Sequence, residues 1–208
     1  MSHGDDNGVS FPPRLAPVQV VIIPIWKSDE QKARIAEAAQ RAAAELGGSL
    51  RVKADLRDEM SPGWKFNEWE MKGVPLRLEI GPRDLDAGHF TAVRRLDRRK
   101  SVVPFGDLAR AVGAQLDAIQ TDMLESRRAA LREGTREARD YAGFQKALDE
   151  AGGFFRAHWC GDAACEARIK DETKATIRCI PLDGNREDGA CLRCGSASRE
   201  WVYFARAY

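Results

Sequence analysis

The sequence predicts a mixed α/β domain with a five-stranded sheet and three helices, followed by a small α+β domain. Two observations indicate this division. Up to about residue 133, short segments with strand-like patterns are interspersed with segments of helical period. All five cysteines then lie within residues 160–194. A chain of 208 residues is long enough for two such domains.

The chain is expected to begin with a linker, a buried strand and a helix. Residues 1–17 are polar and then rich in proline, which is typical of a linker. The run VQVVIIPI at residues 18–25 is nearly all apolar and rich in β-branched residues, as in a strand buried on both faces. A helix should follow Ser28, whose hydroxyl suits an N-cap, and end at Gly47-Gly48. Its buried stripe is predicted to contain Ile35, Ala38, Ala39, Ala42 and Leu46.

Four further strands and two helices complete the first domain. Ser61 and Pro62 suit the N-cap and first position of a second helix, which Gly73 should end. A long helix is predicted over residues 106–133. The strands are expected at residues 50–56, 74–80, 89–96 and 100–105. The apolar stripe of the long helix is predicted to contain Leu108, Val112, Leu116, Ile119, Met123 and Leu124.

A polar stretch, REGTREARD, marks the predicted domain boundary. We therefore expect a first domain at residues 18–133 and a second at residues 134–208. In the second, YAGFQKALDEAGGFF at residues 141–155 predicts a short amphipathic helix.

The cysteine spacing predicts a structural zinc site. Cys160 and Cys165 form one short-spaced pair, and Cys191 and Cys194 form another 25 residues further on. Zinc prefers four soft ligands in a tetrahedron, and a site closed by four thiolates leaves no position for a reacting water molecule. The alternatives are a set of reduced, loosely packed cysteines, or a redox pair at Cys191 and Cys194. A disulfide framework is not expected.

Two other residues between 158 and 179 have side chains that zinc accepts. Cys179 lies in a strand-like apolar segment and is expected to be a buried free thiol. His158 precedes Cys160 by two residues, and a ligand role stays open for it as an alternative.

The net charge is +1, but the distribution of charge is uneven. Residues 77–100 contain seven arginines and lysines against four acidic residues, a local positive patch that suits a polyanion partner or is simply a solvated hairpin. The longest apolar run, VQVVIIPIW, is too short to span a membrane, and no secretion leader is recognisable. A cytoplasmic location without membrane association is therefore expected.

The second helix combines aromatic and acidic side chains. Phe66 and Glu70 lie four residues apart and share a face. An exposed ring stacks on unpaired bases, and a carboxylate accepts hydrogen bonds from the two donors of a free guanine edge. Arg77 and Arg83 then suit guanine O6 and N7, or phosphates. The alternative is a core role for the aromatic residues, which we prefer for Trp64 and Trp69.

Three stretches together resemble prolyl-tRNA synthetases of the archaeal and eukaryotic-like type. They are SHGDDNG…FPPRLAPVQVVIIPI near the start, RDEMSPGWKFNEWEMKGVPLRLEIGPRDL, and WCGDAACEARIK…CLRCG towards the end. The resemblance implies a class II anticodon-binding domain followed by a C-terminal zinc-binding domain.

The resemblance also implies a set of functional residues. The anticodon loop of proline tRNA, whose anticodons end in two guanines, would be read by Phe66, Glu70, Arg77, Arg83 and Lys100. The zinc ligands would be Cys160, Cys165, Cys191 and Cys194. A chain terminus at Tyr208, directed toward the catalytic domain, also matches the family.

The family's catalytic domain would lie before residue 1, so residues 1–17 are expected to be the linker from it. The 208-residue chain is then expected not to form prolyl-adenylate. ATP, Mg²⁺ and a homodimer would belong to the full-length ligase. Two alternatives stay open: a free-standing RNA- or partner-binding protein without catalysis, and a thiol enzyme using Cys191 and Cys194.

Overall fold

The computed structural model describes residues 3–182 and 186–207. The chain divides into two compact units between Arg127 and Arg128. Tyr208, for which the family resemblance implies a role, lies outside the described residues.

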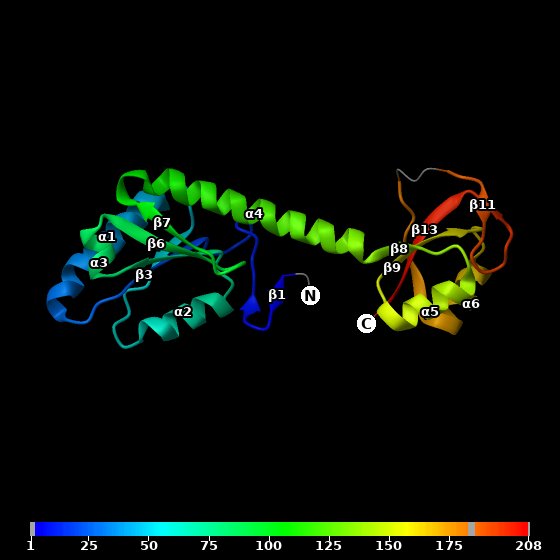
Figure 1. The fold of residues 1–208 in the computed structure, drawn as a ribbon, viewed down its shortest axis with the longest axis horizontal. Helices are drawn as coiled ribbons and strands as arrows, with labels where there is room; N and C mark the ends of the chain where they lie inside the picture. The colour runs from blue at the N-terminus through cyan, green and yellow to red at the C-terminus, as the bar shows by residue number, and fades with distance from the viewer. Residues whose placement is uncertain (1–2, 183–185, 208) are drawn as a thin grey trace. The chain divides into compact units, whose positions relative to one another are not determined.

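A five-stranded mixed sheet forms the centre of the first unit (Figure 1). Its strand order is β4-β3-β5-β6-β7. β3 pairs in parallel with β4 and β5, whereas β5, β6 and β7 pair antiparallel. The strands are β3 (Val20–Pro24), β4 (Val52–Ala54), β5 (Leu76–Ile80), β6 (His89–Arg94) and β7 (Lys100–Pro104). The predicted mixed five-stranded sheet is therefore confirmed.

Two long helices pack their apolar stripes on one face of this sheet. They are α1 (Asp29–Gly47) and α4 (Leu108–Glu133), the latter preceded by the 3₁₀ turn η1 (Phe105–Asp107). All predicted stripe residues are buried except Leu124. The prediction for Leu124 is wrong because it lies one residue, or about 100°, around the helix from the buried Met123. A further short helix, α3 (Pro82–Asp86), was not predicted.

The opposite face of the sheet is only partly covered. Helix α2 (Pro62–Met71) lies over β3 and packs into a small cluster with Val21, Ile23 and Val74. The Ser61 hydroxyl accepts from the Trp64 N–H, and Pro62 occupies the start of the helix, as predicted. On the same face, Val102 of β7 has 61% of its surface exposed, so the side of the sheet formed by β6 and β7 is open.

The segment before β3 packs against the rest of the first unit. β1 (Gly4–Asp5) and β2 (Gly8–Val9) form an antiparallel pair. Gly73, which ends α2 with φ of +73°, lies so close to this segment that a Cβ would be 2.7 Å from the Val9 carbonyl oxygen. The end of α2 is thereby fastened to the N-terminal segment.

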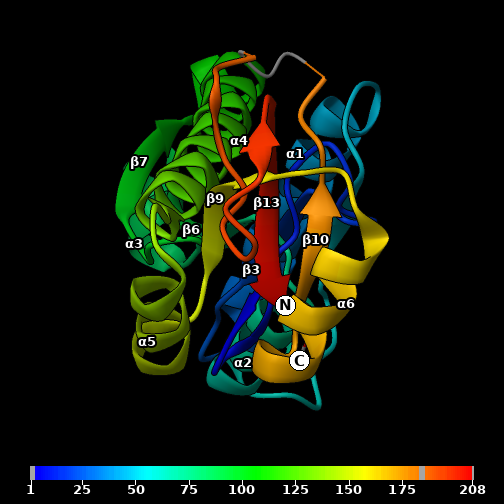
Figure 2. The same cartoon turned by 90° about the vertical axis from the view of Figure 1, so that its right-hand side faces the viewer.

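The second unit is built on a four-stranded sheet in the order β10-β13-β9-β8, with α5 and α6 beside it (Figure 2). The predicted helix at 141–155 is too long, because Gly152 and Gly153 adopt positive φ and the next residues begin a strand. The elements are β8 (Thr135–Glu137), α5 (Tyr141–Ala151), β9 (Phe154–Trp159), α6 (Ala163–Thr173), β10 (Ala175–Cys179), β11 (Gly189–Ala190), β12 (Ala197–Ser198) and β13 (Glu200–Arg206). None of the helices in residues 3–182 and 186–207 combines the length and apolar character needed to cross a bilayer.

Candidate nucleic-acid interface and metal centre

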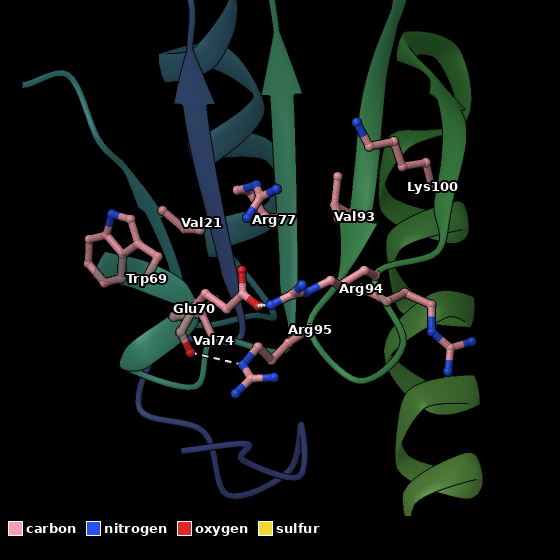
Figure 3. A pocket seen from close by; sticks show the side chains of 10 residues that line it. Val21, Trp69, Glu70, Val74, Arg77, Val93, Arg94, Arg95 and Lys100 are labelled. Atoms are coloured by element: carbon pink, nitrogen blue, oxygen red, sulfur yellow. Dashed lines mark hydrogen bonds and ion pairs between the residues drawn. The ribbon is translucent and has the colours of Figure 1, made fainter. Parts of the chain in front are cut away.

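A cavity of about 150 Å³ lies between the last turn of α2 and the open face of the sheet (Figure 3). Glu70 enters it from α2, Arg77 from β5 and Lys100 from β7. The strand register explains the arrangement. Arg77 pairs with Val93, which pairs in turn with Lys100, so all three side chains stand in one row on the same face.

Phe66 lies one helical turn before Glu70 and is half-buried against the small α2 cluster. The Arg77 guanidinium carbon is 4.2 Å from the centroid of the Phe66 ring. Arg77 also donates from Nε to Glu79 Oε1 over 2.8 Å. The ring and the guanidinium therefore form one stacked unit beside the cavity, and neighbours hold the arginine in place.

The carboxylate of Glu70 is held at the edge of the cavity by the β6–β7 turn. Arg98 donates to Glu70 Oε1 from Nε over 2.9 Å and from Nη2 over 2.6 Å. Arg95 donates from Nε to the Glu70 carbonyl oxygen over 2.9 Å (Figure 3). Only 18% of the Glu70 side chain is exposed.

The five residues predicted to read RNA do not all meet. Glu70, Arg77 and Lys100 line the cavity, and Phe66 contacts Arg77. Arg83 lies on the exposed surface of α3, beyond the far end of β5, and is not part of the cavity lining.

The two tryptophans of α2 differ. Trp69 is buried, as expected, but Trp64 is 45% exposed, so the core prediction for Trp64 is wrong. The two residues are five positions apart and so point about 140° apart around the helix, which prevents both from facing the sheet. Trp64 instead lies beside Arg57, whose guanidinium carbon is 5.3 Å from its ring centroid.

A buried carboxylate fixes α2 on the sheet. Asp55, just after β4, accepts from Trp69 Nε1 over 2.7 Å and from Arg57 Nη2 over 2.6 Å. The buried Lys65 donates to the Asp55 carbonyl oxygen over 3.2 Å. Burial by itself raises the pKa of Asp55, but the hydrogen bonds from Arg57 and Trp69 outweigh it and hold the pKa well below its usual value. Sequence reasoning assigned no role to Asp55.

The sequence did not indicate that Arg95 and Arg98 bind Glu70. Arg95 and Arg98 belong to the positive patch at residues 77–100, and that cationic run was the signal that pointed to them. Nothing local in the sequence indicates which cation of the run reaches α2.

In the second unit, the four predicted ligand cysteines come together. The Sγ atoms of Cys160, Cys165, Cys191 and Cys194 all lie within 4.8 Å of one another. Cys160 follows β9 and Cys165 lies in the first turn of α6, while the other pair occupies the turn between β11 and β12. In that turn, Gly195 has φ of +72° and donates its N–H to the Cys191 carbonyl oxygen.

The cluster fits a tetrahedral metal ion. With metal–sulfur bonds of about 2.3 Å, the sulfurs of a regular tetrahedron are about 3.8 Å apart. The Sγ atoms of Cys160 and Cys194 are 3.8 Å apart. One pair is therefore at the spacing of such a site and the other pairs lie within 4.8 Å, so the four thiols are placed to hold one metal ion.

Cys179 and His158 lie outside this cluster. Cys179 is in β10 as predicted, but its predicted burial is wrong, because it lies on the exposed part of this strand. The ring of His158 instead packs on Trp201, with 3.9 Å between the ring centroids.

Comparison with known proteins adds the following. Residues 19–115 match the model of the anticodon binding domain, and residues 141–208 match the model described as prolyl-tRNA synthetase, C-terminal. Proteins named proline–tRNA ligase from Cenarchaeum symbiosum and Flavobacterium johnsoniae are each 45% identical over the whole chain. A third, from Roseiflexus castenholzii, is also 45% identical. The chain spans 43%, 42% and 44% of the length of these three relatives, respectively.

Proposed function

Because residues 141–208 belong to the prolyl-tRNA synthetase C-terminal family and residues 19–115 to the anticodon binding domain family, we propose that the chain recognises the anticodon of proline tRNA as part of a proline–tRNA ligase. The observation that carries the proposal is the cavity shared by Glu70, Arg77 and Lys100. Glu70 is the one acidic residue of the described lining, and it lies among the cations Arg77, Arg94, Arg95, Arg98 and Lys100. An anion beside cations matches the donors and acceptors of a guanine base.

The chemistry of guanine assigns each side chain a role. The Glu70 carboxylate accepts from guanine N1–H and the N2 amino group, which are free only in an unpaired base. Arg77 and Lys100 donate to O6 and N7, or to adjacent phosphates. Adenine lacks this pair of donors, so guanine is selected over adenine at the base that enters the cavity, as suits an anticodon ending in two guanines.

Phe66 and Arg77 together provide the stacking surface. Unpaired bases stack on aromatic rings and on guanidinium planes, and the 4.2 Å contact places one over the other. Arg83, away from the cavity and exposed, contributes as a phosphate contact.

We propose that Cys160, Cys165, Cys191 and Cys194 hold a structural zinc ion. Four thiolates close its coordination shell and leave no open position for catalysis. The close approach of all four thiols favours a structural metal site over a redox pair at Cys191 and Cys194.

We assign residues 1–17 to the linker, 18–133 to the anticodon-binding domain and 134–208 to the zinc-binding domain.

The remaining activities are proposed for the full-length ligase. ATP and Mg²⁺ bind in its catalytic domain, which also pairs two copies of the protein. The 208-residue chain alone then lacks adenylation activity. Proline tRNA is charged in the cytoplasm, where we place the protein.

The test is binding of the 208-residue chain to anticodon stem-loop RNA at fixed salt. We expect tighter binding to the anticodon UGG than to UAA, by about 1–3 kcal/mol for each guanine that is read directly. Glu70→Gln should lose most of this preference, because an amide offers one acceptor and two donors in place of acceptors only. Glu37→Gln makes the same change of charge on the exposed face of α1 and should retain the preference for UGG. If the wild-type chain binds both RNAs equally, or if Glu70→Gln keeps the preference, the proposal is wrong.

A further inference from the structure

Arginines of the β6–β7 turn, residues 94–99, bind both the backbone and the side chain of Glu70. Arg95 reaches the carbonyl oxygen, and Arg98 reaches Oε1 with two nitrogens. Glu70 lies in the last turn of α2, where the negative end of the helix dipole disfavours a carboxylate. The two guanidinium groups offset this cost and keep the side chain in one place.

The backbone of Arg98 is in an uncommon conformation. Its φ of +56° lies in the left-handed region, where a side chain costs about 1 kcal/mol and glycine does not. Among the described residues other than glycine, only Lys174 shares a positive φ. An arginine in a backbone conformation that favours glycine, with its side chain on the edge of the cavity, points to a role for that side chain.

The contact determines which cation of the cavity pairs with Glu70. Arg98, Arg77 and Lys100 all line the cavity, but the described hydrogen bonds of the Glu70 carboxylate come from Arg98, while Arg77 pairs with Glu79. Both hydrogen bonds from Arg98 go to Oε1, and in the described part of the chain no hydrogen bond goes to Oε2. A carboxylate has about four lone-pair positions, so it accepts from Arg98 and from a base at the same time.

We propose that Arg98 is a specificity-determining positioning residue, which holds the Glu70 carboxylate away from Arg77 and Lys100 and presents it to the two donors of guanine. This inference rests on the proposed function of the cavity. Without Arg98, the carboxylate rotates toward the cations of the cavity, and its preference for guanine is lost even though every base-contacting residue is present.

The decisive variant is Arg98→Gly, because glycine removes the side chain and also relieves the backbone strain. The fold is therefore expected to be kept, with a thermal midpoint no lower than that of the wild-type chain. The probe is the UGG stem-loop and the same RNA with inosine in place of the second anticodon base, which removes only the N2 amino group. We expect a preference for guanine of about tenfold in the wild-type chain and of less than about twofold in Arg98→Gly.

Matched measurements separate this role from others. Arg99→Ala removes an exposed arginine of the same turn that does not bond Glu70, and it should keep the tenfold preference. Arg98→Lys, which restores the charge but not the forked geometry, should give an intermediate preference. The dependence of affinity on salt should stay the same in Arg98→Gly, whereas the loss of a phosphate contact reduces the slope by about one.

Three results distinguish the outcomes. If Glu70→Gln loses the preference for guanine and Arg98→Gly keeps it, the role of Arg98 is overturned and the proposed function stands. If Arg98→Gly weakens both RNAs equally and lowers the salt slope, Arg98 is a phosphate contact and the inference is also overturned. If Glu70→Gln keeps the preference as well, the proposed function itself fails.

Discussion

The indole N–H of Trp69 donates to Oδ2 of Asp55 over 2.7 Å, and both side chains are buried. This bond joins α2 to the end of the edge strand of the sheet, because Trp69 is on α2 and Asp55 follows β4. Asp55 is itself anchored to the sheet, since its N–H donates to the Ile22 carbonyl oxygen over 2.9 Å. This carboxylate therefore contributes to the orientation of α2, and with it to the placement of Phe66 and Glu70, together with the apolar cluster under the helix and the contacts of Glu70 with the β6–β7 turn.

The first prediction concerns the stability of this anchor. Asp55→Asn should lower the free energy of unfolding of the first unit by about 3–5 kcal/mol, because the buried Lys65 loses its buried anionic partner, whereas Arg57 keeps Glu68. Trp69→Phe should cost only about 1–3 kcal/mol, since it removes one hydrogen bond and little volume. Denaturant unfolding measures both, with Asp117→Asn on the exposed side of α4 as the control. Equal stability of Asp55→Asn and the control would contradict the anchor.

The second prediction is an acid dependence with a definite sign. The hydrogen bonds that lower the pKa of Asp55 stabilise its charged form. This contribution is fully present above the unfolded pKa of about 3.9 and is lost as the pH falls toward the lower pKa of the folded state. The free energy of unfolding should therefore decrease below about pH 5, and Asp55→Asn should show a smaller decrease. Parallel slopes for the two proteins between pH 5 and pH 2 would argue against it.

The third prediction separates the two units by their dependence on metal. Removal of zinc by a chelator, or Cys165→Ser, should unfold the second unit and leave the first folded, because a structural zinc site contributes on the order of 10 kcal/mol. Cys179→Ser is the matched control, since this thiol is exposed and outside the cluster. Metal content and amide hydrogen exchange report the result for each unit. A second unit that stays protected without metal would refute the structural role.

The fourth prediction compares Arg77 and Arg83, to which the sequence alone assigns the same RNA-binding role. Arg77→Ala should reduce binding to the UGG stem-loop more than to the UAA stem-loop, because Arg77 lines the cavity and stacks on Phe66. Arg83→Ala should weaken both RNAs to the same extent and lower the salt slope by about one. Affinities measured over a series of salt concentrations decide the matter. Identical behaviour of the two variants would mean that the cavity is not the reading site.

Features that depend on near neighbours were predictable from the sequence. The strands and long helices follow from apolar periodicity, and Ser61, Pro62 and Gly73 mark the ends of α2 because caps are local interactions. The errors involve exposure. Trp64 lies among aromatic and charged residues and Cys179 in a strand-like apolar segment, but which residues of such a segment face the core depends on packing partners elsewhere in the chain. The end of α5 was missed because two glycines were read as part of an amphipathic pattern.

The sequence by itself determined the order of the elements, the composition of their buried stripes and the spacing of the cysteine pairs, because these are properties of short segments. Only the tertiary structure decided that Arg77 and Lys100 share a cavity and that Arg83 does not, since this depends on strand order and register. It also decided which arginine of the β6–β7 turn meets Glu70. That contact joins residues 28 positions apart, and it exists only because β5 and β6 bring the turn to the end of α2.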